Sequence, residues 1–124
     1  MSQMLLSIKP QFVDLIFSGK KKFEYRKTKC KRNVNTIVIY ATAPVMRVVG
    51  EVIIGDIVED SLDVVWEKTK EFSGISKDFF DEYYHGKQSA IAYELENLRI
   101  YEPPLTLEEI GVNSAPQSYC YLDI

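Results

Sequence analysis

Three charged residues at short spacing, Lys21, Glu24 and Arg26, are the side chains of this sequence best suited to act together chemically. A lysine and a glutamate that lie close together can serve as a base and the acid that orients it, provided that burial lowers the pKa of the lysine. An arginine beside them can hold a phosphate or the charge that develops on an oxygen. Glu24 and Arg26 can also form a purely structural ion pair. Strand alternation alone would place Lys21 opposite Glu24, so a shared cavity requires a turn at Gly19-Lys20.

These residues belong to a basic segment, 20–32, in a chain whose net charge is −3. The segment has eight lysines and arginines and one acid, whereas the rest of the chain has seven basic and seventeen acidic residues. Phosphates supply most of the non-specific affinity of nucleic acids, so the segment predicts binding of a nucleic acid or a nucleotide-like anionic ligand. The residues predicted to contact this ligand are Lys20, Lys22, Arg26, Lys27, Lys29 and Arg47. A solvated basic edge, or a surface for an acidic protein, would give the same pattern.

Two further polar residues, Tyr40 and Ser118, are candidates for catalysis. If the ligand is RNA, cleaving it without a metal needs one group to activate the 2′-OH, one to protonate the leaving oxygen, and a cation for the developing charge. Lys21, Arg26 or Arg47 would supply the cation, and Tyr40 and Ser118 would be the polar partners. The structural alternatives are a core tyrosine at 40 and a turn-forming serine at 118.

The sequence indicates neither a metal site nor a cofactor. Cys30 and Cys120 lie ninety positions apart, and with the lone His85 they cannot supply the roughly four ligands of a zinc site. His85 is better placed as a helix cap than as a catalytic base. We expect two reduced thiols, no membrane span and a cytoplasmic protein.

The elements that must position these residues begin with strands around one helix. We expect strands at 4–8, 20–27, 36–41 and 45–55, and a helix that starts at Pro10 and ends at Ser18-Gly19. In the second of these strands, Phe23 and Tyr25 should lie on one face and Lys22, Glu24 and Arg26 on the other. Gly50 marks a bulge or a close backbone approach.

The second half of the sequence predicts two helices and two more strands. The helices span about 65–72 and 76–84, and the aromatic residues of the second, Phe79, Phe80, Tyr83 and Tyr84, are expected to be core packing. A strand at 89–97 should continue toward Tyr101 and break at Pro103-Pro104, and a final strand spans 118–124. About six strands with few helices indicate an α+β fold, which we expect to be a small β-barrel formed by one domain, 1–124.

Four stretches carry a family resemblance, and together they span nearly the whole chain. They are LLSIKPQFVDLIFSGKKKFEYRK, IVIYATAPVMRVVGEV, YYHGKQSAIAYEL and PPLTLEEIGVNSAPQSYCYL. The first contains G-x-K-x-x-E-x-R as Gly19, Lys21, Glu24 and Arg26. Their order resembles the ASCH domain of the PUA-like superfamily. The resemblance implies a pseudobarrel with a cleft lined by this motif and the last strand region, and a role near RNA.

Members of this family include RNA-binding regulators, ribonucleases and amidohydrolases that act on acetylated cytidine. We interpret the chain as an RNA-binding module in RNA metabolism or in regulation linked to translation or transcription. The alternative is a ribonuclease or an amidohydrolase that uses the cleft of Lys21, Glu24 and Arg26. Where the amidohydrolase subgroup carries a threonine nucleophile, this sequence has Glu24, and a carboxylate cannot take that role in the same way. The sequence leaves the oligomeric state open.

Overall fold

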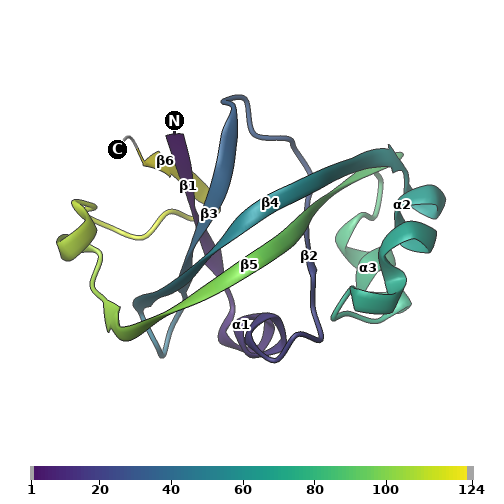
Figure 1. The fold of residues 1–124 in the computed structure, drawn as a ribbon. Coiled ribbons are helices and arrows are strands. Elements are labelled where there is room, and N and C mark those ends of the chain that lie inside the picture. Colours follow the sequence, from purple (N-terminus) through teal and green to yellow (C-terminus); the bar gives the residue numbers. More distant parts are fainter. Residues whose placement is uncertain (1, 123–124) are drawn as a thin grey trace.

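The strands and helices follow the expected order along the chain, and the computed structural model describes residues 2–122. The strands are β1 (Ser2–Ile8), β2 (Phe23–Arg26), β3 (Val34–Ala41), β4 (Arg47–Ser61), β5 (Ser89–Leu105) and β6 (Tyr119–Leu122). The helices are α1 (Pro10–Phe17), α2 (Leu62–Thr69) and α3 (Lys77–Tyr83), with short 3-10 turns η1 (Lys70–Phe72) and η2 (Glu108–Ile110). Figure 1 shows α1 beneath the crossing strands and α2 and α3 together at one end of the long β4–β5 ribbon. The fold is therefore α+β, as predicted.

The six strands form one mixed sheet in the order β2-β5-β4-β3-β1-β6. Only β1 and β3 are parallel, and all other pairs are antiparallel. The sheet does not close, so the predicted barrel is wrong in this respect. The physical reason is that β2 has four residues, all of which pair with β5, and the chain after it leaves the sheet. The two edges of the sheet therefore face each other without a ladder of backbone hydrogen bonds.

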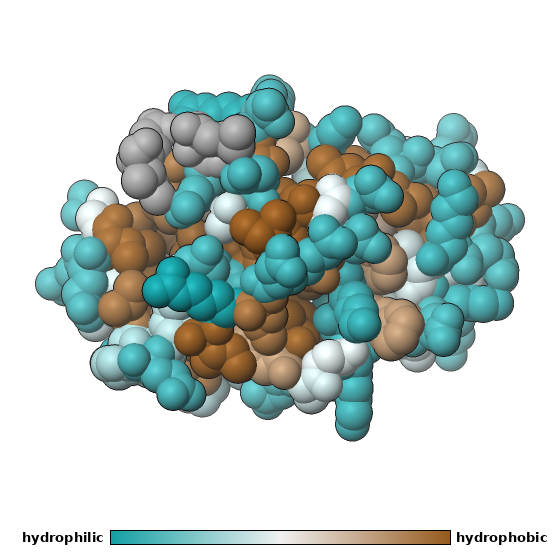
Figure 2. Space-filling view, viewed as in Figure 1, coloured by the Kyte–Doolittle hydropathy of each residue, from teal (hydrophilic) through white to brown (hydrophobic). Residues whose placement is uncertain are grey.

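Strand β3 runs through the middle of the core and is buried on both faces, as its apolar, β-branched sequence predicts. Ile37 and Ile39 lie on the face covered by α1, which buries Val13 and Ile16 against them. Val38 lies on the other face, under the chain segment that follows β5. Because α1 has only eight residues, it leaves some apolar surface uncovered, and Figure 2 shows hydrophobic side chains on this face around α1 and the middle of β4.

Several strand boundaries differ from the predictions; β4, for example, spans Arg47–Ser61 rather than 45–55. Strand β5 continues through Pro103-Pro104 to Leu105, because its pairing with β4 is irregular between Ile100 and Leu105 and β2 pairs only with residues 91–94. Beyond that point one side of β5 has no partner strand, and a proline there removes no ladder hydrogen bond. Strand β2 begins at Phe23 rather than at residue 20. The last strand ends at Leu122 in the described part, and residues 123–124 of the predicted strand lie outside it.

Candidate functional site

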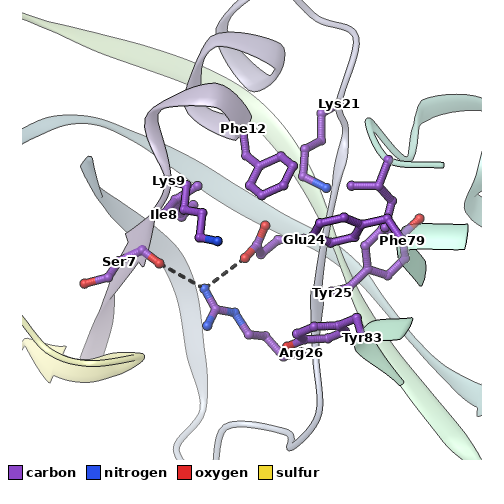
Figure 3. A pocket seen from close by; sticks show the side chains of 11 residues that line it. Ser7, Ile8, Lys9, Phe12, Lys21, Glu24, Tyr25, Arg26, Phe79 and Tyr83 are labelled. Atoms are coloured by element: carbon purple, nitrogen blue, oxygen red, sulfur yellow. Dashed lines mark hydrogen bonds and ion pairs between the residues drawn. The ribbon is translucent and has the colours of Figure 1, made fainter. Parts of the chain in front are cut away.

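A cavity of about 220 Å³ opens where β1 ends, α1 begins, and β2 faces α3 (Figure 3). We call it the motif pocket, because Lys21, Glu24 and Arg26 all line it. Four aromatic side chains form its walls: Phe12, Tyr25, Phe79 and Tyr83. The remaining lining residues are Ser7, Ile8, Lys9 and Ile75.

Lys21 shares this pocket with Glu24, because it lies in a turn before the strand and not in the strand itself. The backbone N–H groups of Lys20 and Lys21 both donate to the carbonyl of Leu15, each at 3.0 Å. The side chain of Lys21 then enters the protein, where the residue is only 3% exposed. Strand alternation therefore does not apply to it, and the turn that a shared cavity requires is present.

The ammonium group of Lys21 is held between a carbonyl and two aromatic rings. Its Nζ donates to the carbonyl oxygen of Ser73 at 2.7 Å and lies 5.0 Å from the ring centroid of Tyr25 and 5.6 Å from that of Phe12. Burial lowers the pKa of Lys21; Glu24 opposes this shift and Arg26 adds to it. Lys21 is therefore a cationic donor that releases its proton more readily than an exposed lysine.

Arg26 reaches from the edge strand β2 to the end of β1 and to Ser118, just before the other edge strand, β6. Its Nη2 lies 2.9 Å from Oε2 of the buried Glu24 and donates to the carbonyl of Ser7 on β1 at 3.3 Å. Its Nη1 donates to Oγ of Ser118, just before β6, at 3.0 Å. Figure 3 shows the contacts of Arg26 with Glu24 and Ser7 as dashed lines. One guanidinium thus holds the floor of the motif pocket across the gap between β2 and β1. Its buried Nε has no hydrogen-bond partner within residues 2–122.

The aromatic face of α3 divides between core and pocket, which corrects the prediction that all four rings are core packing. Phe80 and Tyr84 are buried at 1% and 0% exposure, whereas Phe79 is 43% exposed and Tyr83 is half-buried, and these two line the motif pocket. Burial also raises the pKa of Tyr83. The signal in the sequence was a pair of adjacent i,i+4 stripes, which lie on neighbouring faces of a helix.

Ser118 and Tyr40 were also predicted to be catalytic, and only Ser118 lies near the motif pocket. Ser118 lies at its edge through the hydrogen bond from Arg26. Tyr40 is 4% exposed and packs in the core with Leu5, Val38 and Val48, outside the residues that line the pocket. The nearby Arg47 is exposed and donates to the carbonyl of Met46.

The predicted RNA-contacting lysines do not form one patch. Lys27 follows β2, and its Nζ lies 4.8 Å from the ring centroid of Tyr83. Lys29 comes next and lies 3.9 Å from Glu59. Lys20 and Lys22 precede β2 and lie apart from this loop.

Lys22 precedes β2 and is not among the residues that line the motif pocket, so it does not share a face with Glu24 and Arg26. Its N–H donates to the carbonyl of Phe72. Its Nζ lies over the ring of Phe72 at 4.4 Å. It lines a second cavity of about 540 Å³, which also contains Phe17 and Leu98.

The basic loop after β2 is held in place by two tyrosine hydroxyls. The N–H of Cys30 donates to Oη of Tyr93 at 2.9 Å, and the N–H groups of Lys31 and Arg32 donate to Oη of Tyr121 at 2.8 Å and 3.2 Å. Within the described chain, no cluster of three or more His, Cys, Asp or Glu side chains could hold a metal ion. None of the helices described is long and apolar enough to cross a membrane.

A scan against protein families matches residues 6–105 to the ASCH domain. Over 120 residues, the chain is 28% identical to the large ribosomal subunit protein uL22 of Ureaplasma parvum serovar 3, covering 96% of this chain but only 39% of that protein. Over 127 residues, it is 31% identical to an ASCH domain-containing ribonuclease of Zymomonas mobilis subsp. mobilis, covering 97% of this chain and 84% of that protein. This chain therefore covers well under two thirds of the length of the ribosomal relative. It also covers only 15% of the length of an ATP synthase subunit alpha from the same Ureaplasma.

Solved structures agree with this similarity. The crystal structure of ASCH from Zymomonas mobilis has a TM-score of 0.88 at 29% identity, covering 98% of this chain and 87% of that one. Two single-residue variants of that protein, one with a tyrosine changed to phenylalanine and one with a serine changed to alanine, each have a TM-score of 0.87.

Proposed function

This chain belongs to the ASCH domain family, and from that premise we propose that it binds single-stranded RNA with one unpaired base in the motif pocket. The observation that carries the proposal is a polar floor of Lys21, Glu24 and Arg26 enclosed by aromatic walls. Unpaired RNA bases are recognised by stacking on aromatic rings and by hydrogen bonds to their edges.

The interior of the pocket suits a base better than a phosphate. Arg26 is paired with Glu24 and bound to Ser7 and Ser118, and Lys21 already donates to Ser73. Glu24 therefore compensates one of the two positive charges, and its carboxylate would repel a phosphate placed beside it. The volume of about 220 Å³ is below the roughly 300–1,000 Å³ of pockets for drug-sized ligands, which favours a single flat ring system.

The phosphates of such an RNA would lie outside, on exposed lysines. Lys9 is exposed at the rim, and Lys27 lies beside the pocket wall at Tyr83. Lys29 extends the cationic surface along the loop. Exposed lysines act as mobile point charges toward phosphate. Lys20, Lys22 and Arg47 were also predicted to contact RNA, but they lie away from this path and serve as controls.

The test compares a fluorescently labelled single strand with the same strand annealed to its complement, by anisotropy at fixed salt. A base can enter the pocket only when it is unpaired, so the single strand should bind at least about tenfold more tightly. Equal binding of both forms would contradict the pocket and leave only phosphate attraction. Absence of binding to either form would contradict RNA binding altogether.

A second candidate function, RNA cleavage, is favoured by the relative that is named a ribonuclease. In this chain Ser118 is hydrogen-bonded to Arg26, and Lys21 is buried nearby in the same pocket. If the protein cleaves RNA there, Lys21→Ala should abolish cleavage on a gel while circular dichroism shows an intact fold. Tyr40→Phe tests separately whether the core tyrosine contributes. For amide hydrolysis, position 24 offers a carboxylate paired with Arg26 in place of a hydroxyl nucleophile.

A further inference from the structure

The side chain of Lys21 passes directly beneath Gly74, in the loop between η1 and α3. A Cβ added at Gly74 would lie 2.6 Å from Cβ, 2.7 Å from Cγ and 2.8 Å from Cδ of Lys21. Gly74 also has a φ of +69°, which costs little only for glycine. The loop can therefore close over the lysine only because this position has no side chain.

The same loop holds the head of the lysine and the chain beside it. The carbonyl of Ser73 accepts from Nζ of Lys21 at 2.7 Å, and Oγ of Ser73 donates to the carbonyl of Ile75 at 2.8 Å. The carbonyl of Phe72 accepts from the N–H of Lys22 at 2.8 Å. Both the direction of the ammonium group and the path of its stem are thus set by residues 72–75, far away in the sequence.

Two hydrogen-bonding functions on the pocket floor remain open. An ammonium group has three N–H donors, and Lys21 uses one of them on Ser73. Glu24 uses Oε2 on Arg26, while its Oε1 has no hydrogen-bond partner in the part of the chain that the structure describes. Figure 3 shows Glu24 between Lys21 and Arg26, with one carboxylate oxygen turned toward Arg26 and the other away from it. The floor therefore offers a donor beside an acceptor.

We propose that Ser73 and Gly74 are positioning residues that aim Lys21 at the ligand, so that the motif pocket selects a base edge in which an acceptor stands beside an N–H donor. This inference rests on the proposed function. The acceptor, a carbonyl oxygen or ring nitrogen, takes a hydrogen bond from Lys21, and the N–H donates to Glu24. In uracil the edge is N3–H beside a carbonyl. Methylation at N3 removes the donor and leaves Oε1 of Glu24 unpaired beneath the bound base, which such sites reject strongly.

The first experiment measures anisotropy with two labelled oligouridines that differ only in methylation of N3. The two probes carry the same charge, so the ratio of their affinities measures the effect of methylation at the N3 edge of the base. Loss of a hydrogen bond to a charged group predicts a ratio of about ten or more. Equal affinities would overturn edge selection and leave RNA binding intact. If neither probe nor any other single strand binds, the proposed function fails and edge selection fails with it.

The second experiment compares Gly74→Ala with Gly86→Ala. Gly86 has a similar φ of +80° but nothing within 4 Å of an added Cβ, so it carries the same backbone penalty without touching Lys21. We expect Gly74→Ala to reduce the affinity ratio toward one and Gly86→Ala to preserve it. A preserved ratio in both variants would overturn the positioning role.

A readout that needs no ligand is the reactivity of Lys21 toward an amine reagent, followed by mass spectrometry. In the wild type, Lys21 should be protected while the exposed neighbours Lys20 and Lys22 react. In Gly74→Ala, Lys21 should become reactive, and continued protection would contradict its displacement. If Gly74→Ala does not fold, Lys21→Gly in the same chain should restore folding, because it removes all three atoms that the new Cβ would meet. If Lys21→Gly does not restore folding, the proposed steric contact between position 74 and the side chain of Lys21 is contradicted.

Discussion

At the scale of single residues, the burial of Lys21 makes the stability of the protein depend on pH. The pKa of Lys21 in the folded state is lowered from 10.5, mainly by burial, while Glu24 and Arg26 on β2 act in opposite directions. The unfolded chain therefore binds more protons, and stability should rise with pH from the lowered pKa up to about 10.5. Lys21→Met keeps most of the stem and removes this titration.

Urea unfolding between pH 7 and pH 10 would measure this effect, with the wild type gaining free energy of unfolding relative to Lys21→Met as pH rises. The comparison should stay below pH 10, because burial raises the pKa of Tyr25 to about 12. Tyrosines of this kind ionise first in the unfolded chain, so stability is lost above pH 10 in both proteins. Parallel curves for the two proteins would show that burial does not shift the titration of Lys21.

The spacing of Lys21, Glu24 and Arg26 allowed these residues to be singled out from the sequence, but not their convergence on one cavity. The turn that brings Lys21 inward is made by hydrogen bonds to Leu15, and its ammonium group is held by Ser73, 52 residues away. Periodicity describes residues within one element and carries no information on such distant contacts. The position of Tyr40 could not be predicted for a similar reason. The apolar pattern of a buried strand does not distinguish a tyrosine in the core from a tyrosine that lines a cleft.

At the scale of elements, α3 presents one aromatic stripe to the core and one to the motif pocket, and two substitutions separate these roles. Phe80→Ala should cost about 3–5 kcal/mol of stability, because it empties a buried site. Phe79 is 43% exposed, so Phe79→Ala should change stability little. It should instead weaken RNA binding by about 1–3 kcal/mol, the usual contribution of one stacked base.

The measurements are urea unfolding and anisotropy with single-stranded RNA on both variants. The Phe12 ring meets Phe79 edge-to-face at 5.6 Å, so Phe12→Ala gives a second pocket variant for comparison. Unchanged RNA affinity in Phe79→Ala, with the protein folded, would show that this wall does not contact the ligand.

Elements also show where local sequence rules fail. Proline ends a strand where a neighbouring strand would need the N–H that proline lacks. Strand β5 continues through Pro103-Pro104 because its neighbour β2 is short and its pairing with β4 is irregular there, and both are properties of the sheet. The start of α3 agrees with the helix predicted from about residue 76. There Oγ of Ser76 accepts from the N–H of Phe79 at 3.1 Å, and such capping depends only on residues close together in the chain.

At the scale of the whole molecule, the open sheet explains why the candidate site lies at this position. The edges β2 and β6 lie at opposite ends of the strand order, yet Arg26 reaches from β2 to Ser118 just before β6. A closed barrel would fill this gap with backbone hydrogen bonds and leave no pocket. Because the edges meet only through side chains, the gap stays polar at its floor and open to a ligand.

The distribution of charge over the molecule separates the two parts of the proposed RNA contact. A base inside the motif pocket is uncharged, so binding of a free nucleoside should be nearly independent of salt. Binding of an oligonucleotide should weaken with salt, with a slope of log K against log salt of about −0.7 per phosphate contact for single strands. Lys27→Ala and Lys29→Ala should each reduce this slope by up to about 0.7. Lys20→Ala and Lys22→Ala should leave it unchanged, although all four lysines belong to the same basic segment. Anisotropy across a series of salt concentrations measures the slopes, and equal effects of all four substitutions would mean that RNA contacts the segment diffusely rather than along the loop beside the pocket.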